Sequence, residues 1–161
     1  MAVAAIVAAM AVPQVMVSVD RSRAWGSARY LASRMALARM QAVGRGTTLA
    51  LRFQEEAGGV AFDVFADGNR NGVRTRDIAT GADPAIEPPV RLGEMFPGVA
   101  IDLAADASSL MSFTHLGTAT SGTIYIRGRD GSRFAVRVLG ATGRTRVLQY
   151  SARTDDWVET Y

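Results

Sequence analysis

Residues 1–46 read MAVAAIVAAMAVPQVMVSVDRSRAWGSARYLASRMALARMQAVGRG, and this stretch decides the fold. Met1 to Val19 contain no charged residue, and Asp20 is the first charge of the chain. No glycine or asparagine interrupts the junction between the apolar and the charged part, so nothing forces a turn there. A charge-free stretch of this length can span, or nearly span, a bilayer core as a helix. The pattern predicts a transmembrane helix over 1–20 that continues without a break as an amphipathic helix over 21–46.

The second part of this helix has one apolar face. Apolar residues recur there every three or four positions, as expected for a helix that lies on a sheet, and they are Ala24, Ala28, Leu31, Met35, Ala38 and Ala42. Leu31 and Met35 are its largest members and are predicted helix-packing residues. Gly44 and Gly46 stand where the C-cap of the helix belongs.

Three interpretations of the N-terminus remain open. A cleaved signal peptide is the first interpretation. It requires a basic region before the apolar run, and here the run begins at Met1, although Ala9-Met10-Ala11 resembles a cleavage site. A buried helix of a soluble protein is the second interpretation, because the stretch is rich in alanine. Pro13 favours the third, a membrane-inserted helix, since membrane helices tolerate an internal proline. In that case Ala4 and Ala8 permit close approach of neighbouring helices.

Composition indicates one globular domain over 47–161. The chain has 161 residues and no cysteine, which excludes disulfides, thiolate metal sites and cysteine nucleophiles. All 18 basic residues are arginine, and they concentrate near the two ends, whereas the middle of the chain is acidic. This distribution indicates an anionic partner near the ends or, equally, solvated arginines on strand faces.

After residue 46 the apolar period changes from 3.6 to 2, which predicts strands. A hairpin that turns at Gly58-Gly59 is followed by a long polar loop over 67–89. Further strands are expected at 99–103, at 111–113 and then at 123–127, 133–139 and 146–150. The predicted fold class is therefore α+β, with one long helix on a single antiparallel sheet of six or seven strands.

The polar loop contains a weak calcium candidate. Asp67, Asn69 and Asn71 have the opening spacing of an EF-hand loop, but Ile78 occupies the twelfth position, where a glutamate belongs. A turn stabilised by its own side chains is the favoured interpretation. His115 is the only histidine and has no partner nucleophile at a suggestive spacing. We therefore predict no metal, no cofactor and no enzymatic activity.

The C-terminal arginines form the candidate nucleic-acid site. In the run Gly143-Arg144-Thr145-Arg146, the two arginines are two residues apart on a predicted strand and so project to one face. Forked guanidinium groups suit phosphates, and Tyr150 is a candidate for stacking on a base. Arg137 and Arg153 are the further DNA-binding candidates. The alternative is that these arginines pair with carboxylates on the same sheet or on a neighbouring subunit.

Four segments together resemble the type IV pilins and pseudopilins, and among them the GspH/FimT family of H-type minor pseudopilins. The first is the apolar run Ala-Ala-Ile-Val-Ala-Ala-Met-Ala-Val-Pro-Gln, and the second is Val-Phe-Ala-Asp-Gly-Asn-Arg-Asn-Gly, similar to an F-x-D-x-N-x-N-G loop. The third is Ser-Phe-Thr-His-Leu-Gly, and the fourth is the G-R-x-R turn. They begin at residues 4, 64, 112 and 143 and so cover nearly the whole chain.

The resemblance implies a structural role. It suggests a minor pilin or pseudopilin of a type II secretion or type IV pilus machine, which primes or caps a filament. The expected location is the inner membrane, crossed once, with the C-terminal domain in the periplasm. The expected partners are other pseudopilins, through the N-terminal helix. DNA uptake through the G-R-x-R turn is the alternative function. The family's G-F-T-x-x-E processing signature is absent. A start codon assigned too late, a truncated sequence and an unprocessed protein are the three explanations, and we favour the first.

Overall fold

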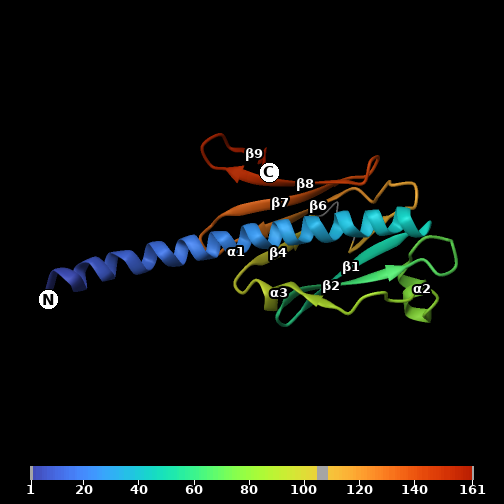
Figure 1. Cartoon of the computed structure of the whole chain (residues 1–161), viewed down its shortest axis with the longest axis horizontal. Coiled ribbons are helices and arrows are strands. Elements are labelled where there is room, and N and C mark those ends of the chain that lie inside the picture. Colours follow the sequence, from blue (N-terminus) through green and yellow to red (C-terminus); the bar gives the residue numbers. More distant parts are fainter. Residues whose placement is uncertain (1, 105–108, 161) are drawn as a thin grey trace.

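A computed structural model describes the backbone of residues 2–104 and 109–160, and the side chains from residue 16 onward. Its dominant element is α1 (Ala2–Arg45), one helix of 44 residues. Figure 1 shows the N-terminal half of α1 projecting away from the domain, while the C-terminal half lies across the sheets. The predicted continuity from residue 1–20 into 21–46 is therefore present in the backbone from Ala2.

The predicted apolar face of α1 is confirmed. Its six residues are all almost completely buried, with at most 3% of their surface exposed, and they are Ala24, Ala28, Leu31, Met35, Ala38 and Ala42. The helix ends as expected at Gly46, whose φ of 63° is left-handed. The N–H of Thr47 donates to the carbonyl of Ala42, and that of Gly46 to Val43, which forms a Schellman motif.

In the part of the chain that the structure describes, no helix is both long and apolar enough to cross a membrane. The side chains of residues 1–15, which make up most of the predicted transmembrane segment, lie outside that part. The side chains of the predicted packing positions Ala4, Ala8 and Pro13 are among them.

Two antiparallel sheets pack beneath α1, where the sequence predicted one. The first sheet has the order β3-β2-β1-β5, and the second has the order β4-β6-β7-β8-β9. The strands of the first are β1 (Leu49–Glu56), β2 (Gly59–Ala66), β3 (Val90–Arg91) and β5 (Leu110–Phe113). Those of the second are β4 (Ala100–Leu103), β6 (Gly122–Arg127), β7 (Arg133–Leu139), β8 (Arg144–Ser151) and β9 (Asp156–Glu159).

The single-sheet prediction was wrong because strand order depends on long-range pairing. The β1–β2 hairpin forms as expected, with Leu49 opposite Ala66 and Glu56 opposite Gly59. However, β5 pairs with β1 and β4 pairs with β6, so the chain passes between the sheets more than once. Alternation of apolar residues identifies a strand but carries no information about its neighbour.

Four short elements were missed. The predicted polar loop over 67–89 contains α2 (Thr75–Thr80), which buries no residue and therefore has no apolar period. The segment after it forms β3 and α3 (Leu92–Met95). Residues near the C-terminus, to which the sequence assigned no strand, add β9 at the edge of the second sheet after a turn at Asp155.

The main core lies between α1 and both sheets. Leu31 and Met35 of α1 join Phe113 of β5, Ile124 of β6 and Val136 of β7 in one buried cluster. Because side chains alternate along a strand, the opposite face of the second sheet points away from α1. That outer face carries most of the C-terminal arginines.

Candidate functional site

The G-R-x-R turn packs against α1. Gly143 has a left-handed φ of 60° and its N–H donates to the carbonyl of Leu139 at 2.7 Å. Nε of Arg39, from α1, donates to the carbonyl of Gly117 at 3.0 Å. A Cβ added at Gly143 would meet that carbonyl and lie 2.9 Å from Cδ of Arg39. The close approach that requires glycine here is therefore made by Arg39 and Gly117 of the same chain.

The structure brings three of the four candidate arginines together. Arg137 of β7 lies directly opposite Arg146 of β8, and Arg144 pairs with Leu139 at the end of the same ladder. Two like charges in opposed positions repel. Nη1 of Arg146 lies 3.2 Å from Oε2 of Glu159, which compensates part of this charge. Arg144 and Arg137 are exposed and form no ion pair within the part of the chain that the structure describes.

Arg153 does not belong to this group. It is exposed in the turn between β8 and β9, beyond the opposite end of β8 from Arg144. The seven steps from Arg144 to Ser151 correspond to roughly 23 Å of strand. One compact phosphate contact therefore cannot include both residues.

Tyr150 is already covered. The guanidinium of Arg133 lies 3.6 Å from the centre of its ring, and Trp157 makes an edge contact with it at 5.5 Å. Its hydroxyl donates to the carboxylate of Asp155, and this hydrogen bond raises the pKa of Tyr150. Tyr125 lies 5.6 Å from Trp157. Sequence reasoning missed this aromatic group because its members come from β6, β8 and β9 and meet only through the strand order.

The side chains of the candidate calcium loop accept hydrogen bonds from the loop's own backbone N–H groups. The carboxylate of Asp67 accepts the N–H groups of Asn71 and Gly72 at 3.2 and 2.8 Å. Asn69 accepts the N–H of Asn71 at 3.2 Å. Asn71 and Asn69 hydrogen-bond to Asp77 and, with nearby arginines, lower its pKa. The side chains proposed as ligands thus make the contacts of an Asx-rich turn.

A buried carboxylate that sequence reasoning missed closes the same loop. Asp83 is 1% exposed and accepts the N–H groups of Gly68 and Arg74 at 3.1 and 3.0 Å. Nothing in its spacing distinguishes it from the surface carboxylates around it. His115 is exposed and lines a cavity of about 420 Å³ with Asp67 and Arg70. Within the described residues, no group of three or more His, Cys, Asp or Glu side chains could hold a metal ion.

The outer side of α1 is a second candidate surface. Met40 is 68% exposed, Val43 is 50% exposed and Leu37 is 37% exposed. We call these three residues the α1 outer stripe. The predicted packing residues Leu31 and Met35 are completely buried in this chain's own core, so they are not available to a neighbouring subunit.

A long N-terminal helix that lies across antiparallel sheets and leaves an apolar stripe exposed defines a pilin-like protein. A model of the family described as type II transport protein GspH matches residues 27–143, and the chain belongs to this family. The prediction of an H-type minor pseudopilin is thereby confirmed. This is a family of structural subunits, in agreement with the prediction that the chain is not an enzyme. Arg144 and Arg146 lie beyond the matched range.

The fold is similar to that of the minor pseudopilin EpsH from the type 2 secretion system of Vibrio cholerae. The similarity covers 79% of this chain and 97% of that chain, with a TM-score of 0.58 and 15% sequence identity. The comparison with curated proteins gives no match.

Proposed function

We propose that this protein is anchored in the inner membrane by the N-terminal part of α1, with its globular domain in the periplasm. From there it enters a type II secretion pseudopilus as a minor subunit and contacts other pseudopilins through α1. The α1 outer stripe is the observation that carries this proposal. These three side chains lie on the side of α1 that faces away from its own domain, so they do not contribute to the core. Apolar side chains exposed in this way indicate a contact with another molecule.

The stripe suits a neighbouring helix. Leu37, Met40 and Val43 follow each other at intervals of three residues, so they occupy adjacent turns of one side of α1. Burial of these side chains against a partner contributes roughly 25 cal/mol per Å² of apolar surface removed from water. This contribution favours a specific contact once a membrane holds the two helices in parallel.

Cysteine cross-linking in cells tests this proposal. Because the chain has no cysteine, a single Met40→Cys variant forms disulfides only with a partner. With a cysteine at the facing position of a co-expressed pseudopilin, we expect a covalent heterodimer and reduced secretion after cross-linking. Arg76→Cys, on the exposed surface of α2, is the matched control. Equal cross-linking at both positions, or none at any position along the stripe, would contradict the proposed packing.

DNA binding is the second candidate function, favoured by Arg144 and Arg137, which form no ion pair within the described residues and lie with Arg146 on one outer face. Guanidinium groups on neighbouring strands can contact successive phosphates without reading the sequence. A titration with duplex DNA at two salt concentrations tests it. The Arg144→Ala/Arg146→Ala variant should lose affinity and show a shallower salt dependence, whereas Arg153→Ala should not. Absence of binding by the wild-type protein at low salt would eliminate this function.

A further inference from the structure

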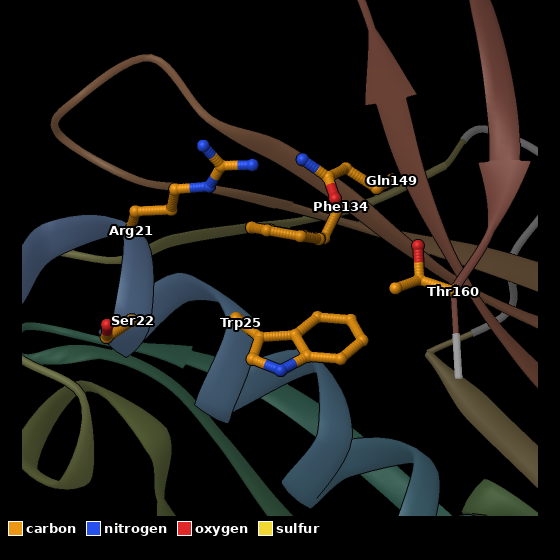
Figure 2. A pocket seen from close by; sticks show the side chains of 6 residues that line it. All are labelled: Arg21, Ser22, Trp25, Phe134, Gln149 and Thr160. Atoms are coloured by element: carbon orange, nitrogen blue, oxygen red, sulfur yellow. The ribbon is translucent and has the colours of Figure 1, made fainter. Parts of the chain in front are cut away.

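A cavity of about 380 Å³ opens where α1 leaves the globular domain. Its lining comes from both ends of the chain: Arg21, Ser22 and Trp25 of α1, Phe134 of β7, Gln149 of β8 and Thr160 after β9. Figure 2 shows Arg21 and Gln149 extending toward each other, with the rings of Phe134 and Trp25 beneath them. The cavity thus combines a polar upper wall with an aromatic floor.

The aromatic floor is a built feature of the fold. The rings of Trp25 and Phe134 lie 5.4 Å apart at an angle of 43°. Arg21 and Trp25 are four residues apart on α1, so both project on the same side of the helix. Arg29 lies 5.7 Å from the centre of the Trp25 ring and adds a second positive charge beside it.

The positive charge of Arg21 is not compensated by the protein. Within the described residues Arg21 makes no ion pair, and the adjacent Asp20 is bonded instead to Arg23 at 3.4 Å. Arg21 is exposed, so its guanidinium is available to an anion. The hydroxyl of Ser22 and the amide of Gln149 line the same cavity, and within the described residues neither side chain forms a hydrogen bond. This set of donors fits a phosphodiester.

With the membrane anchoring proposed above, the cavity borders the lipid headgroup layer. Below it the helix is free of charge from Met1 to Val19, and Met16 and Val17 are 64% and 54% exposed. With a rise of 1.5 Å per residue, Arg21 lies about 3 Å and Trp25 about 9 Å beyond Val19. The headgroup region on each side of a bilayer is roughly 5–7 Å thick, so Arg21 lies within this layer and Trp25 lies just beyond its periplasmic edge. Tryptophan is enriched at membrane interfaces, and arginines near the ends of membrane helices extend their charged groups to the same region.

We propose that this cavity binds the phosphate of an anionic glycerophospholipid in the periplasmic leaflet, with Arg21 as the main ligand. This inference rests on the membrane anchoring proposed above. Occupation of the cavity by a headgroup sets the height and rotation of the domain on the bilayer, because the lining joins α1 to β7 and β8. Subunits waiting for assembly are then presented with the α1 outer stripe in one orientation.

Tryptophan quenching of the full chain in vesicles tests the proposal. We reconstitute the chain in a Trp157→Phe background, so that Trp25 is the only tryptophan, into phosphatidylcholine vesicles and into vesicles of equal parts phosphatidylcholine and phosphatidylglycerol. Flotation first measures insertion, and acrylamide then measures access to Trp25. We expect the quenching constant to be at least halved in the anionic vesicles, because the headgroup covers the indole.

Two variants separate the cavity from general surface charge. Arg21→Gln should abolish the protection of Trp25 by anionic lipid. Arg23→Gln removes the same charge, but its side chain points to the other side of the helix, since two residues correspond to about 200° of rotation. It should retain most of the protection. Equal losses in both variants would mean ordinary attraction to an anionic surface and would overturn the cavity assignment.

The remaining outcomes are also decisive. Equal quenching in both vesicle types, with the chain inserted in both, would overturn the inference and leave the membrane anchoring intact. A chain that floats with neither vesicle would contradict the anchoring itself. Protection by soluble glycerol 3-phosphate in detergent, as strong as that by anionic vesicles, would show a free phosphate site and overturn the assignment to a membrane lipid.

Discussion

Replacing Gly143 by alanine should destabilise the domain through its contact with α1. The residue has a φ of 60°, in the left-handed region. An alanine Cβ there would collide with the carbonyl of Gly117 and lie 2.9 Å from Nε of Arg39, the atom that donates to that carbonyl. Either the turn before β8 must move, or Arg39 must leave its position.

The expected loss has two components. A left-handed conformation costs a non-glycine residue about 1–2 kcal/mol. Loss of the Arg39 hydrogen bond adds about 0.5–1.5 kcal/mol, and the sum is roughly 1.5–3.5 kcal/mol of unfolding free energy. Gly131→Ala isolates the first component, because Gly131 has a φ of 82° and nothing within 4 Å of its added Cβ. Neither component applies to Gly44→Ala, because Gly44 is helical and has nothing within 4 Å of an added Cβ. This variant should raise the unfolding free energy by up to about 1 kcal/mol.

Urea denaturation of the full chain in detergent micelles, followed by tryptophan fluorescence, measures all three variants. The predicted order of stability is Gly44→Ala, then wild type, then Gly131→Ala, with Gly143→Ala lowest. If Gly143→Ala is no less stable than Gly131→Ala, the contact between Arg39 and the turn carries no energy and the reasoning is wrong. The added variant Arg39→Ala removes the contact of the new Cβ with Arg39, though not that with the Gly117 carbonyl, and should reduce the penalty of Gly143→Ala in a double-mutant cycle.

Four further predictions concern stability. Met35→Ala removes a fully buried side chain and should lower the unfolding free energy by about 2–5 kcal/mol. Met40→Ala, at a site 68% exposed, should change it by less than about 0.5 kcal/mol, and urea denaturation compares the two. Asp83→Ala leaves the N–H groups of Gly68 and Arg74 without an acceptor and should cost about 2–4 kcal/mol in the same assay, whereas a loss as small as that of Met40→Ala would refute its structural role. The hydrogen bonds from Asn71 and Asn69 hold the pKa of Asp77 below its ordinary value of 3.8. Its contribution is therefore present above that value and is lost as the pH falls below about 4, so Asp77→Asn should flatten the acid side of a plot of Tm against pH. Millimolar calcium should leave Tm unchanged, because the Asp67 carboxylate already accepts two backbone N–H groups, and a rise in Tm would support a calcium site.

The long helix was predictable because its signal is local and repeated. Six apolar residues at intervals of three or four specify one face, and all six are buried. The Gly46 cap follows from the need for a left-handed residue at the helix end. The β1–β2 hairpin was equally local, because its two strands are joined by a two-residue loop.

The candidate site was predictable only in part. The alternation along β8 placed Arg144 and Arg146 on one side of a strand. The structure adds that Arg137 lies opposite Arg146 and that Arg146 forms an ion pair with Glu159. The partner Glu159 comes from β9, which the sequence did not reveal. The space beside Gly143 is occupied by Arg39, which lies more than a hundred residues earlier in the chain.

The sequence by itself therefore determined the helix, its buried face, most strands and the resemblance that the family match confirms. Only the tertiary structure decided the division into two sheets, the pairing of the C-terminal arginines and the cavity that joins Arg21 to Gln149. The physical reason is the range of the interactions. Helix periodicity, caps and tight turns depend on residues within a few positions of each other. Strand order and cavities depend on side chains that meet only after the core between α1 and the sheets has closed.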